Sequence, residues 1–163
     1  EVGRGTTVSL YLPHSNDAET AAGAAAPAEA EVLFSENSET VLVVEDNADV
    51  REVTLQRIEA LGYVVLEASS GPEAIEIIEA HPEIAMVFSD VVMPGGMSGY
   101  DIANWIAANR PSLPVVLTSG FSASSGLQDL PPAAHSILHK PYSRTELSHV
   151  LNAALVASKP SVS

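Results

Sequence analysis

Hydrophobic residues from position 40 onward follow two alternating spacings. Short runs rich in Val, Ile and Leu are typical of strands buried on both faces of a sheet, and they read TVLVVE, YVVLEA, IAMVFSD, PVVLTS and SILH. Between most of these runs the apolar residues recur at helical spacing, and Ser70 with Glu73 and Ser143 with Glu146 have the pattern of helix caps. The pattern predicts an α/β fold over residues 40–157, a doubly wound five-stranded parallel sheet with helices on both faces.

Four parts of the chain have weaker patterns. Residues 1–12 end with Val8, Leu10 and Leu12 at a period of two, which predicts one strand. Residues 13–39 are rich in Ala and Glu and poor in aromatic residues, which indicates a linker that the chemistry of the main domain does not need. Residues 121–132 have a weak helical pattern and predict a short helix or mostly loop, and residues 158–163 form a tail.

Charge and composition narrow the functional classes. The net charge is −14, of which residues 13–39 contribute six acids and no Lys or Arg. Such an acidic chain repels phosphate backbones and anionic lipids, so we expect neither a nucleic-acid partner nor direct membrane contact. There is no cysteine, which excludes disulfides and thiolate metal sites.

Polar residues end four of the five predicted strands. Glu45 and Asp46 follow the first, Asp90 ends the third, Thr118 lies in the fourth and Lys140 follows the fifth. Parallel strands end at one edge of their sheet, so these side chains should share one crevice. Oxygen ligands without Cys or His suit a hard cation, Mg²⁺ or Mn²⁺, which would offset the repulsion between the carboxylates. A lysine and a hydroxyl complete a phosphoryl clamp, with a carboxylate as nucleophile.

Four segments resemble the motifs of the response-regulator receiver family, in the family's order and spacing. They are VLVVEDNADVR, FSDVVMPGGMSG, VVLTSGF and LHKPYS, within residues 40–157. The resemblance implies a flavodoxin-like fold with strand order 2-1-3-4-5, which is one of the common orders of doubly wound parallel sheets. It further implies that Asp90 accepts a phosphoryl group from a phosphohistidine in the presence of Mg²⁺ and that the domain then changes conformation.

The resemblance also assigns roles to individual residues. Asp46 and Asp90 would bind the metal directly, Glu45 through a water molecule and Val92 through its backbone carbonyl. Thr118 would be the switch hydroxyl and Lys140 the family's lysine, with a cis bond before Pro141.

The first residues, EVGRGTTVSLYLP, resemble the last strands of a histidine-kinase ATP-binding domain. This implies that the chain is the C-terminal part of a hybrid histidine kinase, cytoplasmic even if its parent is anchored in a membrane. The fragment would accept a phosphoryl group without being a stand-alone kinase. Its expected partners are the phosphohistidine domain of its own or a cognate kinase and a downstream histidine phosphotransfer protein.

Three features depart from the common receiver pattern. The loop after Asp90 is one residue longer than the commonest form. Ile137 replaces the usual aromatic residue of the switch, which leaves the output mechanism open. The positions that tune the lifetime of the phosphoryl group hold Val92 and Gly120, neither of which offers a polar side chain. We therefore expect a long-lived acyl phosphate.

Other interpretations compete with this one. Taken singly, Asp46 is compatible with a helix cap and Asp90 with a turn former. A phosphohydrolase of the haloacid-dehalogenase type also uses Asp, Thr, Lys and Mg²⁺, but its nucleophile follows the first strand. A passive docking module that has lost phosphorylation is the third alternative.

Overall fold

The structure is a computed structural model that describes residues 31–94, 96–120 and 134–158. The strand expected in residues 1–12, most of the expected linker, the segment 121–132 and all but the first residue of the tail lie outside the described residues. The compact unit that contains the sheet begins at Glu31.

The described chain contains five strands and four helices, which alternate up to β4. In chain order they are β1 (Thr40–Val44), α1 (Ala48–Glu59), β2 (Val64–Ala68), α2 (Gly71–Ala80), β3 (Ile84–Asp90), α3 (Gly99–Asn109), β4 (Val115–Ser119), β5 (Ala134–His139) and α4 (Arg144–Ser158). Each strand lies within two residues of its predicted bounds. Within the described ranges, no helix combines the length and the apolar character that a membrane span requires.

The strands form one parallel sheet in the order β2-β1-β3-β4-β5. This confirms the predicted flavodoxin-like fold. The order reverses between β1 and β3, because the chain first adds β2 on one side of β1 and then places β3 on the other. Ligands of such sheets bind at the carboxyl ends of the strands next to this reversal, where β1 and β3 end side by side.

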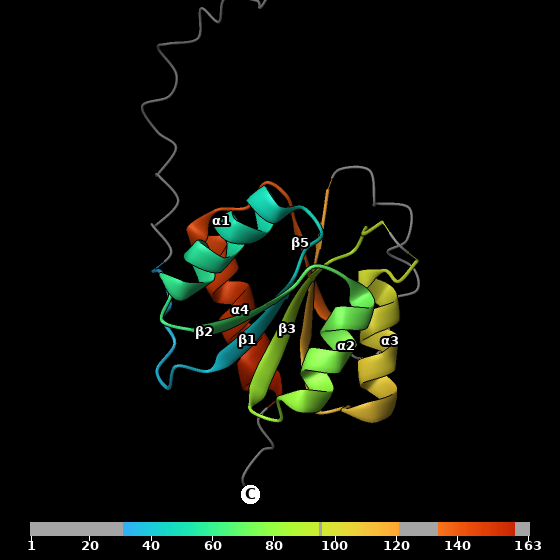
Figure 1. Ribbon diagram of the computed structural model, residues 1–163. Coiled ribbons are helices and arrows are strands. Elements are labelled where there is room, and N and C mark those ends of the chain that lie inside the picture. The colour runs from blue at the N-terminus through green and yellow to red at the C-terminus, as the bar shows by residue number, and fades with distance from the viewer. Residues whose placement is uncertain (1–30, 95, 121–133, 159–163) are drawn as a thin grey trace, which may run out of the picture. The chain divides into compact units, whose positions relative to one another are not determined.

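Alternate side chains of the inner strands fill two separate cores. In β1, Leu42 and Val44 face the core that α2 and α3 cover, whereas Val41 and Val43 face the core under α1 and α4. Figure 1 shows these two pairs of helices on opposite faces of the sheet. Since every β1 side chain after Thr40 is buried, the strand reads as a continuous apolar run. Burial on both faces therefore fixes where each inner strand ends.

Hydrogen-bonding side chains set the helix starts. Asn47 caps α1 by accepting from the backbone of Asp49 and Val50, and Ser98 and Asp101 form a reciprocal capping box at α3. The expected box of Ser143 and Glu146 opens α4. At α2, Ser70 caps as predicted, but the carboxylate of Glu73 binds Ser69 rather than Ser70.

Residues 31–39, which fall within the predicted linker, contact the sheet unit. The backbone N–H of Leu33 donates to Ser148 Oγ over 3.2 Å, and that of Ser35 donates to the carbonyl of Leu61 over 2.8 Å. Val32 packs against the core under α1 and α4. Residues 31–39 therefore add partly buried surface and hydrogen bonds at the C-terminal end of α1 and along α4.

We expect a chain that starts at Thr40 to unfold about 5–10 °C below one that starts at Glu31, because at least four hydrogen bonds and the packing of the partly buried Val32 are lost. Thermal unfolding followed by circular dichroism measures the difference. Phosphorylation at 20 °C should be equal in the two chains, since none of these contacts reaches Asp90. Equal melting temperatures would show that residues 31–39 add nothing to the fold.

Candidate functional site at the carboxyl ends of the strands

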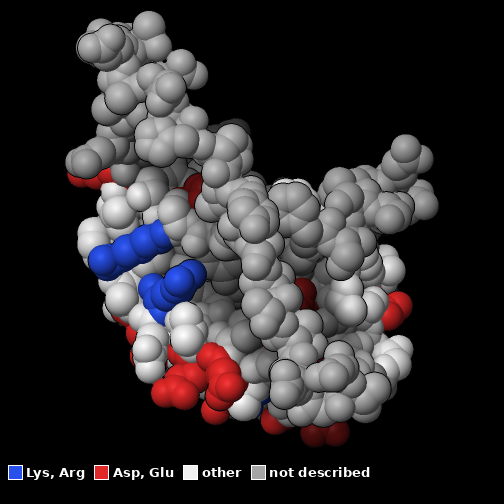
Figure 2. Space-filling view, turned by 90° about the horizontal axis from the view of Figure 1, so that it is seen from above, with Lys and Arg blue, Asp and Glu red and all other residues white. Residues whose placement is uncertain are grey.

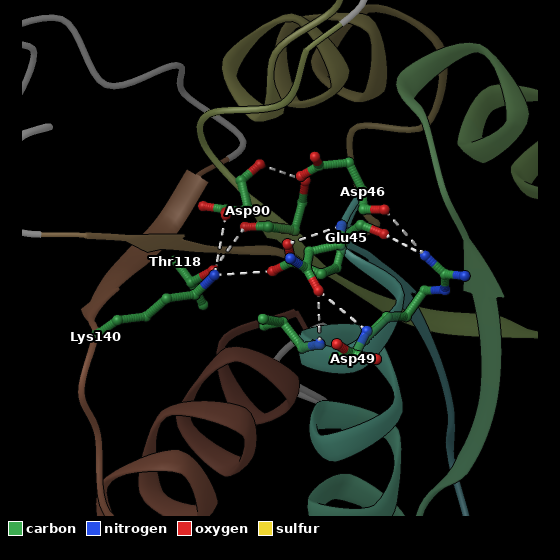
Figure 3. Close-up of polar contacts among 10 residues, drawn as sticks. Glu45, Asp46, Asp49, Asp90, Thr118 and Lys140 are labelled. Atoms are coloured by element: carbon green, nitrogen blue, oxygen red, sulfur yellow. Dashed lines mark hydrogen bonds and ion pairs between the residues drawn. The ribbon is translucent and has the colours of Figure 1, made fainter. Parts of the chain in front are cut away.

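Four strands bring the predicted polar side chains to one place. Glu45 follows β1, Asp90 ends β3, Thr118 pairs with Asp90 in the register of β4, and Lys140 follows β5. Figure 3 shows Lys140 extending from the end of β5 toward Asp90 and Glu45, with Asp46 on the far side of the cluster. Residues separated by as many as 95 positions in the sequence thus meet, because parallel strands end at the same edge.

Lys140 bridges two of the carboxylates. Its Nζ donates to Glu45 Oε2 over 2.8 Å and to Asp90 Oδ2 over 2.9 Å. The Glu45 and Asp90 side chains are only 7% and 15% exposed, so water screens these ion pairs little. Burial by itself lowers the pKa of the Lys140 amine, but the hydrogen bonds that it donates to Glu45 and Asp90 outweigh this effect and raise that pKa. The amine therefore remains a cation at physiological pH.

Three carboxylates offer a set of ligands for a divalent metal. One oxygen each from Glu45, Asp46 and Asp90 lies within 4.8 Å of the others. Asp46 does not cap α1, since Asn47 does, and its carboxylate has no hydrogen bond or ion pair within the described ranges. Oxygen atoms alone at this spacing fit a hard cation such as Mg²⁺.

Arg51, which sequence reasoning missed, holds the backbone next to this cluster. Its Nη1 donates to the carbonyl of Glu45 over 2.8 Å, and its Nε pairs with Glu67 at 2.8 Å. Arg51 thus ties the first turn of α1 to the end of β1 and to β2. Two features of the sequence could have indicated this role: Arg51 lies six residues after Glu45, and an arginine side chain carries several donors in a fixed plane.

Thr118 is buried, and its Oγ1 donates to the backbone carbonyl of Ser89 over 3.5 Å. The hydroxyl is therefore held at the strand end by one long hydrogen bond. Ile137 pairs with Leu117 and is partly buried against the core under α2 and α3. The bond between Lys140 and Pro141 is cis, as the sequence predicted.

The two positions expected to tune the lifetime of the phosphoryl group, Val92 and Gly120, carry no polar side chain. Val92 is 66% exposed. A Cβ added to Gly120 would meet no heavy atom within 4 Å. Both positions therefore have space for larger side chains.

Gly99, a second residue that sequence reasoning missed, lets α3 approach the end of β3. A Cβ at this position would lie 2.3 Å from the backbone oxygen of Asp90, far inside the contact distance of two atoms. The Gly99 N–H also donates to the carbonyl of Val91 over 3.1 Å. The first turn of α3 thus packs directly on the backbone that carries Asp90.

The family model described as the response regulator receiver domain matches residues 41–152. The chain belongs to the response-regulator receiver family, the phospho-accepting domains of two-component signalling systems. This family match does not support the haloacid-dehalogenase alternative, which would place its nucleophile at the first strand, whereas Asp90 ends β3.

Curated relatives include both sensor kinases and a single-domain regulator. The chain is 36% identical over 156 residues to the sensor kinase CckA of Brucella abortus, covering 91% of this chain and 16% of that protein. It is 32% identical to the autoinducer 1 sensor kinase/phosphatase LuxN of Vibrio campbellii, over 74% of this chain and 14% of LuxN. It is 28% identical to the receiver protein CpdR of Brucella abortus, over 72% of this chain and 98% of CpdR. The chain therefore spans a small part of the two kinases.

Solved structures support the same fold. A response regulator receiver domain protein from Clostridium thermocellum superposes with a TM-score of 0.67 at 28% identity, over 72% of this chain and 94% of that one. A receiver protein from Sinorhizobium medicae gives 0.67 at 25% identity, over 77% of this chain and 100% of that one.

Proposed function

We propose that Asp90 accepts a phosphoryl group from a phosphohistidine and that Lys140 and Thr118 hold the transferred group. The observation that carries this proposal is the position of Lys140, whose ammonium contacts Asp90 Oδ2 and Glu45 Oε2 at once. Because Lys140 is held against Asp90, its positive charge lies where it would offset the negative charge of a phosphoryl group transferred to that residue.

The transfer requires one bond to form and one to break. An oxygen of Asp90 forms a bond to phosphorus, while the bond from phosphorus to the donor imidazole nitrogen breaks. The imidazole keeps the electron pair and takes up a proton. Lys140 stays beside the site as a cation, and the buried hydroxyl of Thr118 lies next to Asp90 in the sheet register, within reach of a phosphoryl oxygen after a small shift.

We assign the metal to Asp46 and Asp90 directly, to Glu45 through water and to the backbone carbonyl of Val92. When bound, Mg²⁺ would neutralise phosphoryl oxygens during transfer. The preference for an indirect contact to Glu45 agrees with the ion pair that already engages its Oε2. Asp46, whose carboxylate has no partner among the described residues, is the acid most available as a ligand.

We further propose that Thr118 and Ile137 form the switch region. Thr118 is held by one long hydrogen bond, so a new phosphoryl acceptor competes easily with the carbonyl of Ser89. Ile137 lies on the neighbouring strand next to Leu117. An aliphatic side chain here responds by repacking against the core rather than by forming a new hydrogen bond.

The parent protein is, in our proposal, a hybrid sensor kinase. The alignment with CckA covers 91% of this chain, more than the residues 41–152 matched by the receiver family alone. Similarity therefore extends beyond the receiver into the flanking sequence, in accord with an ATP-binding domain remnant in residues 1–12 and a linker after it. The phosphoryl group would come from a kinase histidine and pass on to a histidine phosphotransfer protein.

A groove beside the site provides a place for the phosphohistidine domain. It has a volume of about 400 Å³ and is lined in part by Val50, Val53, Arg57, Lys140 and Tyr142. Because Lys140 lines both the groove and the site, a helix seated here brings its phosphohistidine close to Asp90. The guanidinium of Arg57 lies over the Tyr142 ring at 5.9 Å and offers a cation to an acidic partner. Figure 2 shows basic side chains next to one another, with acidic side chains nearby.

Asp90→Asn should abolish phosphorylation by acetyl phosphate and Mg²⁺ while leaving the fold intact, because the amide cannot supply the attacking oxygen. Intact-mass spectrometry detects the added phosphoryl group, and circular dichroism checks the fold. Full labelling of the variant at the same peptide would refute the assignment. Absence of labelling in the wild-type chain would instead favour the passive docking module.

Asp46→Ala should weaken Mg²⁺ binding roughly tenfold or more, because it removes a direct oxygen ligand. Isothermal titration of the unphosphorylated chain measures the affinity. Asp49→Ala is the matched control, since it removes one nearby carboxylate from an exposed position outside the cluster. Equal affinity in wild type and Asp46→Ala would place the metal elsewhere.

Val53→Glu should slow phosphotransfer from a protein donor about tenfold or more, because a buried charge at an interface is costly. Autophosphorylated CckA of Brucella abortus serves as that donor, and acetyl phosphate, which needs no docking, should react as before. Val156→Glu, also at an exposed helical valine, should change neither rate. A variant that reacts normally with CckA would exclude this groove as the docking site.

The double variant Val92→Asn, Gly120→Glu should hydrolyse its acyl phosphate about tenfold faster than wild type or more, because polar groups at the rim position the attacking water. Both side chains have space, as the exposure of Val92 and the open surroundings of Gly120 show. Loss of the phosphorylated mass with time measures the decay, and Val64→Asn, exposed elsewhere on the sheet, is the control. Unchanged decay would mean that Val92 and Gly120 do not set the lifetime.

A further inference from the structure

The loop between β3 and α3 carries Val92 and is fastened at several points. Val91 and Met93 are buried in the core under α2 and α3, on either side of the exposed Val92. Farther along, Met97 packs against the same core. Between these anchors the backbone turns at Gly96, which has a φ of 99°. The path of the loop therefore depends on where Met97 is seated.

Met97 is seated against Gly71, the first residue of α2. A Cβ on Gly71 would lie 2.5, 2.6 and 2.7 Å from the Cγ, Cβ and Sδ of Met97. Carbon atoms in contact normally lie about 3.5–4.0 Å apart, so any side chain at position 71 displaces Met97. Backbone conformation does not call for glycine here, because the described glycines with positive φ are Gly62 and Gly96.

The helix start does not call for glycine either. Ser70 caps α2 by accepting from the backbone of Glu73, and Pro72 occupies the first turn. These residues open a helix whatever follows the cap, and alanine favours a helix more than glycine does. The close approach of Met97 is thus the feature of the structure that accounts for glycine at position 71.

We propose that the contact between Gly71 and Met97 positions the loop that presents the Val92 carbonyl to Mg²⁺. Gly71 and Met97 are positioning residues, which touch neither the metal nor the phosphoryl group. The inference rests on the metal site proposed above. It adds a mechanical link between α2 and that site, passing through one side chain.

The three methionines of the chain provide a direct readout. Met93 and Met97 lie in or against the core under α2 and α3, whereas Met86 lies in the core on the other face. In methyl NMR spectra of the wild-type chain without metal and with Mg²⁺, the Met93 and Met97 signals should move on titration while that of Met86 stays. In Gly71→Ala the Met97 signal should already be shifted without metal.

Gly71→Ala should also raise the dissociation constant for Mg²⁺ roughly tenfold, a typical loss when the support of a metal site is disturbed. Phosphorylation by acetyl phosphate should slow at low Mg²⁺ and recover at saturating Mg²⁺, since Asp90 and Lys140 are unchanged. Ile78→Val, which removes one methyl group from the buried face of the same helix, should lower stability without changing Mg²⁺ affinity.

Met97→Ala tests the same contact from the side of the loop, and it introduces no overlap. It should weaken Mg²⁺ binding by itself, and adding Gly71→Ala to it should cause no further loss, because the new methyl group then has space. A Gly71→Ala chain with wild-type affinity, or an equal loss in both backgrounds, would overturn the positioning role. Absence of Mg²⁺ binding in the wild-type chain would overturn the proposed metal site, and the positioning role with it.

Discussion

Three carboxylates share a space in which their oxygens lie within 4.8 Å, and Lys140 is the cation that contacts two of them. At that separation each pair of like charges repels by about 3 kcal/mol for the effective dielectric constant near a protein surface. The formal charge of the three acids and Lys140 is −2, which a divalent cation would cancel. The unbalanced charge persists because the fold holds the acids in place, and it favours a bound divalent cation, which would also offset the negative charge of a phosphoryl group.

The sheet supplies that hold. β1 and β3 are inner strands with a core on each face, so neither can slide without exposing apolar side chains to water. Arg51 ties the first turn of α1 to the end of β1, and the close contact at Gly99 ties α3 to the backbone of Asp90. Packed elements thus surround the acids. The burial of apolar side chains on β1 and β3 offsets the repulsion between the crowded carboxylates.

Much of this arrangement follows from the sequence, because buried parallel strands read as apolar runs and their polar ends must meet. Composition alone did not reveal that residues 31–39 contact α1 and α4, since Val32 and Leu33 stand in an acidic, Ala-rich context. Asn47 and Asp46 are both good caps, and only the backbone geometry distinguishes them. The contact of Gly71 with Met97 depends on distances between elements, which no local pattern contains.

The closeness of Gly99 to Asp90 has a genetic consequence. Every single-base change in a glycine codon that yields another amino acid introduces a Cβ, and at this position that atom would lie 2.3 Å from the Asp90 carbonyl oxygen. The helix or the strand end would then have to move. Gly99 is therefore a place where one base change would disturb the packing of α3 on Asp90, the proposed acceptor, while leaving the codons of Asp90, Lys140 and Thr118 intact.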